Sequence, residues 1–447
     1  MGQQEPDPVR LEPRPVVPTR VRYVVLAVVC SLAVLTYVQR QGFIRGTPYT
    51  KADLGLDDEQ MTFLTFSVWL IGYGLFQVPC GLLGDWLGAR HVLTLLVLSW
   101  SLLVGAVALT AGLPPGGWLV FACLAVLRFL FGGLQAGGFP VLARVIADWM
   151  PARQRGFAQG MSWMCTRLGG FVAPLLVGWM IRDVFHGWVT PLWLLAGLGL
   201  LWCAFFWPWF RNRPEEMPRV NAAECDLIAA GHPVRPVVKG PVPWSLFLRS
   251  RNVWALSLMY GCVGFAGNFL TGPLAIYLQD HLHFSGKETD WLTGLPLFCA
   301  AFSCVLGGFL SDWLIRRTGS RKWGRRLVGA VGLTLAIFAV LLNIWVQEVW
   351  LVGFALCAWF FLNDTMIGPA WASCADIGER YAGTLSGTMN MTGAFMGAVG
   401  MWLAGRWLRQ GEYTLMFSVF ACSYGLAALC WLGVDVTKPL VPRTQEP

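Results

Sequence analysis

Gly81-Leu-Leu-Gly-Asp85-Trp86-Leu87 occurs a second time in this chain, with small changes, as Gly308-Phe-Leu-Ser-Asp312-Trp313-Leu314. The two aspartates lie 227 residues apart. A second and unrelated pair, Arg155-Gly156 and Ala382-Gly383, has the same offset. Two motifs that share one offset indicate that the chain contains a duplicated unit of roughly half its length.

Long apolar runs fill most of the sequence around these motifs. Of the 447 residues, 56% are hydrophobic and 13% are charged, whereas soluble domains carry about 25% charged residues. A run of 18 or more apolar residues is long enough to cross a bilayer core of about 30 Å. Such runs predict twelve transmembrane helices, and hence an all-α membrane protein, with starts near Val24, Met61, Val92, Trp118, Gly156, Trp188, Val253, Trp291, Leu327, Val349, Thr384 and Thr414.

A polar, basic and proline-rich segment at 211–251 separates the first six predicted helices from the last six, because repeated prolines oppose a continuous helix. The predicted organisation is therefore a disordered tail, a six-helix bundle, a linker, a second six-helix bundle and a short tail, at 1–21, 22–210, 211–251, 252–435 and 436–447.

The positions of Lys and Arg predict the orientation in the membrane. With both termini in the cytoplasm, 23 of the 33 basic residues fall on the cytoplasmic side, as cytoplasmic loops of membrane proteins are enriched in Lys and Arg. We expect a multi-pass protein of the cell's inner membrane. This distribution also accounts for the net charge of +8 without a nucleic-acid partner.

Two arginines, Arg40 and Arg128, lie inside apolar runs. A charge at membrane depth costs about 3 kcal/mol or more, so it usually faces a polar cavity and has a function there. Arg128 and Gln135 are seven residues apart, which places them on one helix face. Since a guanidinium suits a carboxylate, these residues indicate an anionic substrate. The alternative is that Arg128 binds backbone carbonyls at a helix break.

Four stretches resemble a known family. The loop 81–90 is similar to the cytoplasmic signature of the major facilitator superfamily, in which an Asp and a following basic residue gate the inner face. The stretches 128–140, 148–156 and 369–391 resemble its anion:cation symporter family, which includes relatives of sialin and bacterial carriers of hexuronates, aldonates and aldarates. The resemblance implies two pseudo-symmetric six-helix bundles and a functional monomer.

The same resemblance implies roles for single residues. Arg40 matches the family's main ligand for the substrate carboxylate, and Tyr73 matches a tyrosine that hydrogen-bonds substrate. Trp371 and Asn390 fall where sugar-acid carriers contact substrate hydroxyls, although core filling is the alternative for such aromatic residues. Thr166 takes a position where these carriers often have glutamine. Gating roles fall on two acid–base pairs: Asp85 with Arg90, and Asp312 with Arg316.

The chain departs from the family at the coupling site. Proton-coupled members have carboxylates where Gln39 and Gln135 stand here, and an amide does not titrate. Asp364 is the acid centred in a transmembrane run, which makes it a candidate site for a coupling ion or, alternatively, a support for an irregular helix with Asn363. Arg167 either faces the cavity or contacts a neighbouring helix.

These observations predict a secondary active transporter of a small organic anion, most simply a sugar acid, that works by alternating access. Coupling to H⁺, to Na⁺, to a counter-substrate or to no ion stays open. An uncoupled facilitator, an anion exchanger and a non-transporting receptor are the alternatives. Neither an ATP-binding loop nor a hydrolase motif occurs in the sequence, so we expect no enzyme activity, no cofactor and no metal site.

Overall fold

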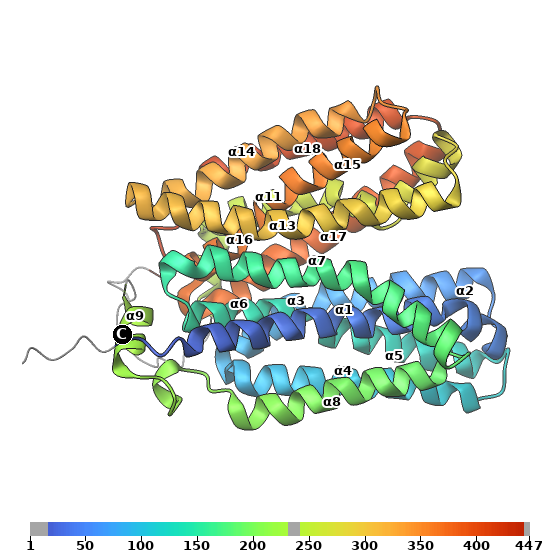
Figure 1. Cartoon of the computed structure of the whole chain (residues 1–447), viewed down its shortest axis with the longest axis horizontal. Coiled ribbons are helices and arrows are strands. Elements are labelled where there is room, and N and C mark those ends of the chain that lie inside the picture. Colours follow the sequence, from blue (N-terminus) through green and yellow to red (C-terminus); the bar gives the residue numbers. More distant parts are fainter. Residues whose placement is uncertain (1–16, 231–241, 442–447) are drawn as a thin grey trace, which may run out of the picture.

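The computed structural model describes residues 17–230 and 242–441 of the chain, and residues 1–16, 231–241 and 442–447 lie outside the described part. Within the described part the chain forms helices without strands. The helices run roughly parallel to one long axis and gather in two bundles, the first half of the chain below and the second half above in Figure 1. This arrangement confirms the predicted fold class.

Six membrane-length segments form the N-terminal bundle, and two of them are interrupted. A π-helical turn at Phe63–Ser67 joins α2 to α3, and Gly137 separates α5 from α6. The helices are α1 (Val21–Leu54), α2 (Asp58–Thr62), α3 (Val68–Leu87), α4 (Ala89–Leu109), α5 (Trp118–Ala136), α6 (Gly138–Trp149), α7 (Arg155–Trp179) and α8 (Val189–Trp209).

The described residues of the linker contain two short α-helices, and the C-terminal bundle repeats the pattern of the first. Here too, one membrane-length segment breaks at mid-length, between α15 and α16. The helices are α9 (Ala222–Ala229) and α10 (Trp244–Arg249) in the linker, and then α11 (Arg251–Gly267), α12 (Pro273–Ile276), α13 (Gly286–Thr318), α14 (Arg321–Leu342), α15 (Val349–Asp364), α16 (Ile367–Gly378), α17 (Ala382–Arg409) and α18 (Tyr413–Gly433).

By length and composition, eleven stretches of the described chain are able to cross a membrane. One of them, Val349–Arg409, has 61 residues, which as a helix would extend about 90 Å, three times the hydrocarbon core. Glu379 divides it with a positive φ of 44°, and α17 then packs back against α16 and α6. This stretch therefore supplies two crossings, and the described chain has the twelve that the sequence predicts.

Both ends of the described chain lie at the same end of the molecule as the linker (Figure 1). The backbone N–H of Val21 donates to Glu224 of α9 at 2.9 Å, and Arg22 Nη1 forms an ion pair with the same carboxylate at 2.9 Å. Asn252, at the start of α11, donates to the carbonyl of Asp435 at 2.9 Å. The carbonyl of Val17 accepts from Asn221 Nδ2 at 2.8 Å, and that of Lys438 from Asn252 Nδ2 at 3.2 Å, so the described parts of both predicted tails make contacts with the starts of α9 and α11.

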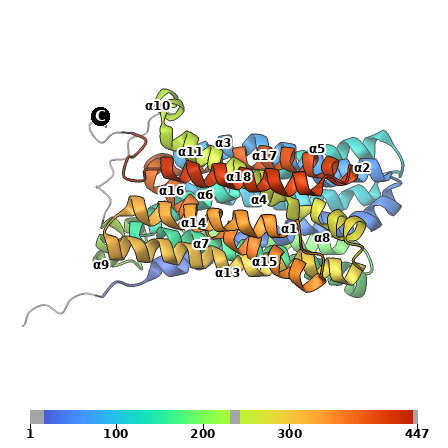
Figure 2. The same cartoon turned by 90° about the horizontal axis from the view of Figure 1, so that it is seen from above.

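The two bundles meet where glycines let backbones touch, chiefly along α7 with α13 and α3 with α17 (Figure 2). A Cβ atom on Gly160 would lie 2.3 Å from the carbonyl oxygen of Cys304, and one on Gly387 would lie 2.5 Å from that of Gln77. No real Cβ approaches an oxygen so closely. Small residues allow membrane helices this contact, so the repeated glycines of the sequence mark the joint between the bundles.

Candidate functional site

Arg40 lies on α1 in an aromatic setting. Its Nε donates to Gln135 Oε1 of α5 at 3.2 Å, and its Cζ lies 4.3 Å from the ring centroid of Trp69 and 4.7 Å from that of Tyr37. Rings at these distances favour a cation. Nη2 of Arg40 is buried and has no hydrogen-bond partner among the described residues. The guanidinium is therefore held in place with one donor group left open.

Tyr73 and Asn390 connect this arginine to the C-terminal bundle. The ring of Tyr73 stacks on Trp69 at 4.8 Å, and its hydroxyl accepts a hydrogen bond from Asn390 Nδ2 at 3.4 Å. The same amide donates to Gln77 Oε1 at 2.9 Å. Two further buried donors, Trp69 Nε1 and Gln77 Nε2, have no partner within the described residues.

Open donors on Arg40, Trp69 and Gln77 thus belong to one chain of contacts. A buried donor without an acceptor costs about 1–3 kcal/mol, so native proteins keep few of them. Oxygen acceptors of an anion are the kind of partner that these three donors lack. The arrangement is suited to a carboxylate or sulfonate that carries further oxygens.

Arg128 has a different environment from Arg40. Its Nε donates to the carbonyl of Leu64 at 3.2 Å and its Nη2 to that of Thr65 at 3.0 Å. Both carbonyls belong to the π-helical turn after α2, where the usual helical bonding is interrupted. Only about 10 Å³ of free space lies beside Arg128, lined in part by Phe43, which is roughly room for one water. The geometry is the helix-break alternative of the sequence analysis.

The polar residues predicted beside these arginines are bonded within the N-terminal bundle. Gln135 donates to the carbonyl of Thr36 at 3.1 Å while it accepts from Arg40, so it positions the guanidinium. Gln39 donates to the carbonyl of Leu195 at 2.8 Å. Thr166 donates to the carbonyl one turn back on its own helix, that of Ser162, at 2.9 Å. Gln39 and Thr166 therefore use their donors on protein.

Trp371 is buried in an aromatic cluster that spans both bundles. Its Nε1 donates to the hydroxyl of Tyr260 at 3.2 Å, and its ring centroid lies 5.2 Å from that of Trp163 and 6.3 Å from that of Phe139. Its exposed fraction is 1%. The structure thus gives Trp371 the features of core packing, which was the alternative to contact with substrate.

Arg167 and Asp364 form an ion pair between the bundles. Nε and Nη2 of Arg167, on α7, donate to the two carboxylate oxygens of Asp364, on α15, at 2.6 and 3.1 Å. Asn363 Nδ2 donates to the same carboxylate at 2.7 Å. Of the two directions left open for Arg167, the one found is toward a neighbouring helix, and the neighbour is the acid predicted as a coupling candidate.

Asp85 caps a helix of the opposite bundle. Its carboxylate accepts from the backbone N–H groups of Gly383 and Thr384 at 2.9 and 2.6 Å, and from the Thr384 hydroxyl at 2.7 Å. These are unpaired donors of the first turn of α17, where a negative charge is favourable. Arg144 adds an ion pair at 3.6 Å, and it also pairs with Asp148 at 2.7 Å, as its spacing predicts.

Asp312 makes the reciprocal contact. It accepts from the backbone N–H groups of Gly156 and Phe157, at the start of α7, at 3.2 and 2.7 Å. Arg325 of α14 pairs with Asp312 at 2.7 Å and contacts Asp376 at 3.4 Å. Arg155 pairs with Asp376 at 2.7 Å. The four side chains form a buried network of alternating charge that joins α7, α13, α14 and α16.

Arg90 and Arg316 are not the cations that the structure brings to these aspartates. Arg90 Nε donates to the carbonyl of Trp207 at 2.9 Å, at the end of α8. Arg316 is exposed, with its Cζ 5.9 Å from the ring of Phe309. The partners come instead from Arg144 and Arg325, which lie on other helices. The pairing that the resemblance implied for Arg90 and Arg316 is therefore not the one found, because a helix end directs neighbouring side chains to different faces.

The structure has two bundles of six membrane-length segments, and exchanged helix caps close the bundles on each other at one end. Arg40 keeps an open donor group at their joint. These features define a two-bundle membrane transporter. The match to a family model agrees with this class and covers residues 29–401. The chain belongs to the Major Facilitator Superfamily.

Curated relatives align with nearly the whole chain. The chain is 29% identical over 418 residues to a probable sulfoacetate transporter of Cupriavidus necator, covering 93% of this chain and 94% of the relative. It is 29% identical over 397 residues to a probable galactarate/D-glucarate transporter of Escherichia coli, covering 85% and 86%. A hexuronate transporter of Escherichia coli is 24% identical over 429 residues, covering 95% and 96%.

Solved structures support the fold. The proton:xylose symporter XylE superposes with a TM-score of 0.72 at 15% identity, covering 94% of this chain and 97% of the other. The human organic anion transporter MFSD10 superposes with a TM-score of 0.67 at 16% identity, covering 92% and 99%. At these identities the likeness concerns the fold alone.

Proposed function

We propose that the protein carries a small organic anion, of the sugar-acid or sulfonated-acid class, across the membrane by alternating access. The observation that supports this most is the set of open buried donors on Arg40, Trp69 and Gln77. Donors without acceptors fit a ligand that brings several oxygen acceptors and a negative charge. The named substrates of the relatives, sulfoacetate, galactarate, glucarate and hexuronate, are all such anions.

Within this proposal Arg40 binds the acid group, and Gln135 and the rings of Tyr37, Trp69 and Tyr73 hold it in place. Asn390, from the other side of the joint, and Gln77 bind the hydroxyl groups of the substrate. Arg128 fixes the π-helical turn that precedes α3, and it thereby supports the position of Trp69 and Tyr73 on that helix. We assign no direct substrate contact to Thr166 or Trp371.

The exchanged caps on α7 and α17 act as the gate. In the state described here, Asp85 and Asp312 bridge the bundles at one end of the molecule. Alternating access requires these contacts to break together and the bundles to rock about the bound anion. Arg144, Arg325, Arg155 and Asp376 supply the charges that make the closed gate stable.

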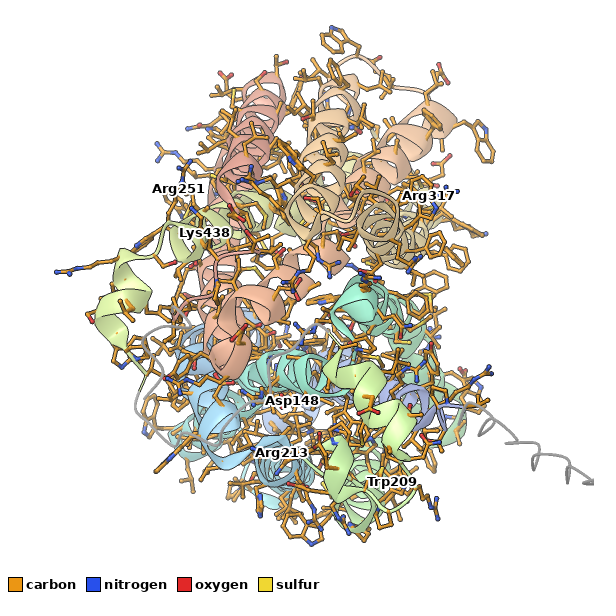
Figure 3. All side chains as sticks on the ribbon, turned by 90° about the vertical axis from the view of Figure 1, so that its left-hand side faces the viewer. Asp148, Trp209, Arg213, Arg251, Arg317 and Lys438 are labelled. Carbon is orange, nitrogen blue, oxygen red and sulfur yellow. The ribbon has the colours of Figure 1, made fainter. Side chains whose placement is uncertain are left out.

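We infer that the gated end faces the cytoplasm of a cell whose inner membrane holds the protein. Figure 3 looks onto this end, where Arg213, Arg251, Arg317 and Lys438 are labelled. An excess of Lys and Arg is typical of cytoplasmic loops. Fusion of green fluorescent protein or alkaline phosphatase to the C-terminus tests the orientation. Fluorescence without phosphatase activity supports a cytoplasmic terminus, and the reverse pattern contradicts it.

Counterflow in proteoliposomes tests the transport proposal. Proteoliposomes that contain the purified protein and are preloaded with unlabelled glucarate, sulfoacetate or glucuronate are expected to accumulate the same anion in labelled form from outside. Arg40→Gln is expected to lower the uptake rate at low substrate by about tenfold to hundredfold, because a charge-assisted bond is worth about 1.5–3 kcal/mol. Arg45→Gln, an exposed arginine on the same helix, is the matched control and should transport normally.

Uptake by Arg40→Gln at the wild-type rate would contradict the assignment of the site. Binding without counterflow would instead favour a receptor on the same scaffold. Chemical crosslinking during the assay tests the proposed functional monomer, since every residue of the site comes from one chain. Activity that appears only in crosslinked dimers would refute it.

A further inference from the structure

Arg167 offers a second cationic group at the joint between the bundles. Asp364, which takes its Nε and Nη2, is fully buried with 0% exposure, whereas the side chain of Arg167 keeps 23% exposure. Nη1 of Arg167 donates to no oxygen among the described residues, although Cys304 lies close enough to interact with the guanidinium. One edge of the guanidinium therefore faces the buried acid, and the remaining edge is accessible.

The accessible arginine lies on the same side of the joint as Arg40. The ring of Tyr37 contacts both regions: Arg40 Cζ lies 4.7 Å from its centroid, and a Cβ atom on Gly170 of α7 would lie 3.4 Å from its edge. Gly170 is less than one helical turn beyond Arg167. On the other side of Arg167, Cζ lies 5.8 Å from the ring of Trp163. Arg40 and Arg167 are thus neighbours across one tyrosine.

We propose that the substrate is a dianion, with one acid group on Arg40 and the second on the open edge of Arg167, and that Asp364 takes up one proton when this second group binds. This inference rests on the proposed function and adds to it the charge of the substrate and the coupling ion. The proton comes from water on the side to which the site is open, and it leaves with the substrate on the other side.

Charge balance gives the reason for the proton. While Asp364 is ionised, its charge compensates that of Arg167, so a second anionic group gains little attraction and is repelled by the buried carboxylate. Once Asp364 is protonated, Arg167 becomes an uncompensated cation beside Arg40. Binding of the dianion and of the proton therefore strengthen each other.

The other groups around Asp364 supply no positive charge to its carboxylate. Cys304 of α13 contacts its carboxylate at 3.6 Å, and Asn363 is its neighbour on α15. The phenols of Tyr260, on α11, and Tyr424, on α18, lie within electrostatic range of it, and their hydroxyls accept from Trp371 and Trp359. All four are uncharged near neutral pH, so Arg167 supplies the positive charge that Asp364 meets.

Binding to matched pairs of anions tests the proposal. Glucarate and gluconate share one carbon skeleton and differ by one carboxylate, and sulfoacetate and glycolate differ by the sulfonate. Affinities are measured by calorimetry on the full-length protein in detergent between pH 5.5 and 7.5, where these acid groups stay ionised. We expect the dianion of at least one pair to bind about tenfold or more tightly than its monoanion, and to bind more tightly as the pH falls.

Three variants separate the steps. Asp364→Asn is expected to keep the preference for the dianion and to lose its pH dependence. The double variant Arg167→Gln/Asp364→Asn leaves no unpaired charge, so its folding can be verified by an unchanged melting temperature. It should bind both members of a pair with affinities within about threefold. Arg40→Gln should lose both members.

The outcomes distinguish this inference from the function on which it rests. Equal affinity of the wild type for both members of each pair, or a preference that survives in the double variant, overturns the dianion proposal and leaves the anion transporter standing. A pH dependence that survives in Asp364→Asn overturns the role of Asp364. Normal binding of both members by Arg40→Gln overturns the proposed site itself.

Discussion

The gate and the midplane site are built from the same kinds of residue, but they treat hydrogen bonding in opposite ways. At the gate, Asp312 accepts two backbone bonds and one ion pair, and Asp376 is shared by two arginines. At the midplane site around Arg40, Arg40 and Gln77 each keep a buried donor that has no partner among the described residues. The chain pairs the acids by which it closes on itself, although Nε of Arg380 at this end also has no partner among the described residues, and it leaves several donors open where we propose that another molecule binds.

The largest effect is expected from Asp312→Asn. The change leaves Arg325 and Arg155 with one acid between them, and removing one partner of a buried pair costs about 3–5 kcal/mol. The melting temperature should fall by several degrees, and spin labels on either side of the gate should report a longer distance. Asp58→Asn is the control, because its pair with Lys51 is exposed and exposed pairs contribute little. Equal melting of the two variants would contradict the role of the network.

Asp85→Asn is expected to have a smaller effect at the equivalent position. Its bonds come from two amides and a hydroxyl, an asparagine oxygen still accepts some of them, and Arg144 keeps Asp148 as a partner. We expect a loss of about 1–2 kcal/mol in gate stability, measured by the same melting and distance experiments. If Asp85→Asn lowered the melting temperature more than Asp312→Asn, the two aspartates would not contribute to gate stability in the order that their ion pairs indicate.

Trp69→Phe tests the open donors of the midplane site. The ring and its contact with Arg40 remain, while the unpartnered N–H is removed. Anion affinity should fall about tenfold, the effect of one bond to a charged acceptor, and the melting temperature should not fall. Trp188→Phe is the opposite control, because its N–H donates to Asp53 at 2.7 Å. That variant should lose stability and keep its affinity.

The smallest effect concerns the contact of α9 with the start of α1. Burial opposes ionisation of Glu224, but the hydroxyl of Thr19, the backbone amides of Val21 and Arg22 and the Arg22 guanidinium outweigh it and hold its pKa below the usual value of 4.5. A depressed pKa contributes stability that is present above the ordinary value and lost as the pH falls through the folded-state pKa. At pH 7 the free energy of unfolding of Glu224→Gln should therefore be lower than that of the wild type by about 1 kcal/mol or less. This gap should close as the pH falls below 4.5; a gap independent of pH would contradict the assignment.

Much of the fold follows from the sequence because its signals are local. Apolar runs define the crossings, and the observed helix starts at Trp118, Val349 and Tyr413 agree closely with the predicted ones at Trp118, Val349 and Thr414. The repeated glycine and aspartate motifs predicted two halves. That each aspartate caps the other half's helix required the packing of the bundles, which no local pattern contains.

Less of the site could be predicted from the sequence, because its contacts also depend on how the helices pack. Arg40 was predicted as a ligand, and its setting depends on Trp69, which no motif singled out. The carbonyls that occupy Arg128 come from a π-helical turn, and apolar residues do not reveal where such a turn occurs. The missed cations Arg155 and Arg325 are recognisable only once Asp376 is placed between them.

The exchange of caps between Asp85 with α17 and Asp312 with α7 is the contact pattern of a two-fold homodimer, in which each partner contributes the same plug and the same socket. A six-helix ancestor carrying one aspartate loop and one glycine-opened helix would already have held two copies of itself together. A tether such as 211–251 is then enough to join two such units in one chain. Each half carries one capping aspartate and one helix start that the other half's aspartate caps. A substitution on one side of this contact therefore requires a matching change in the other half.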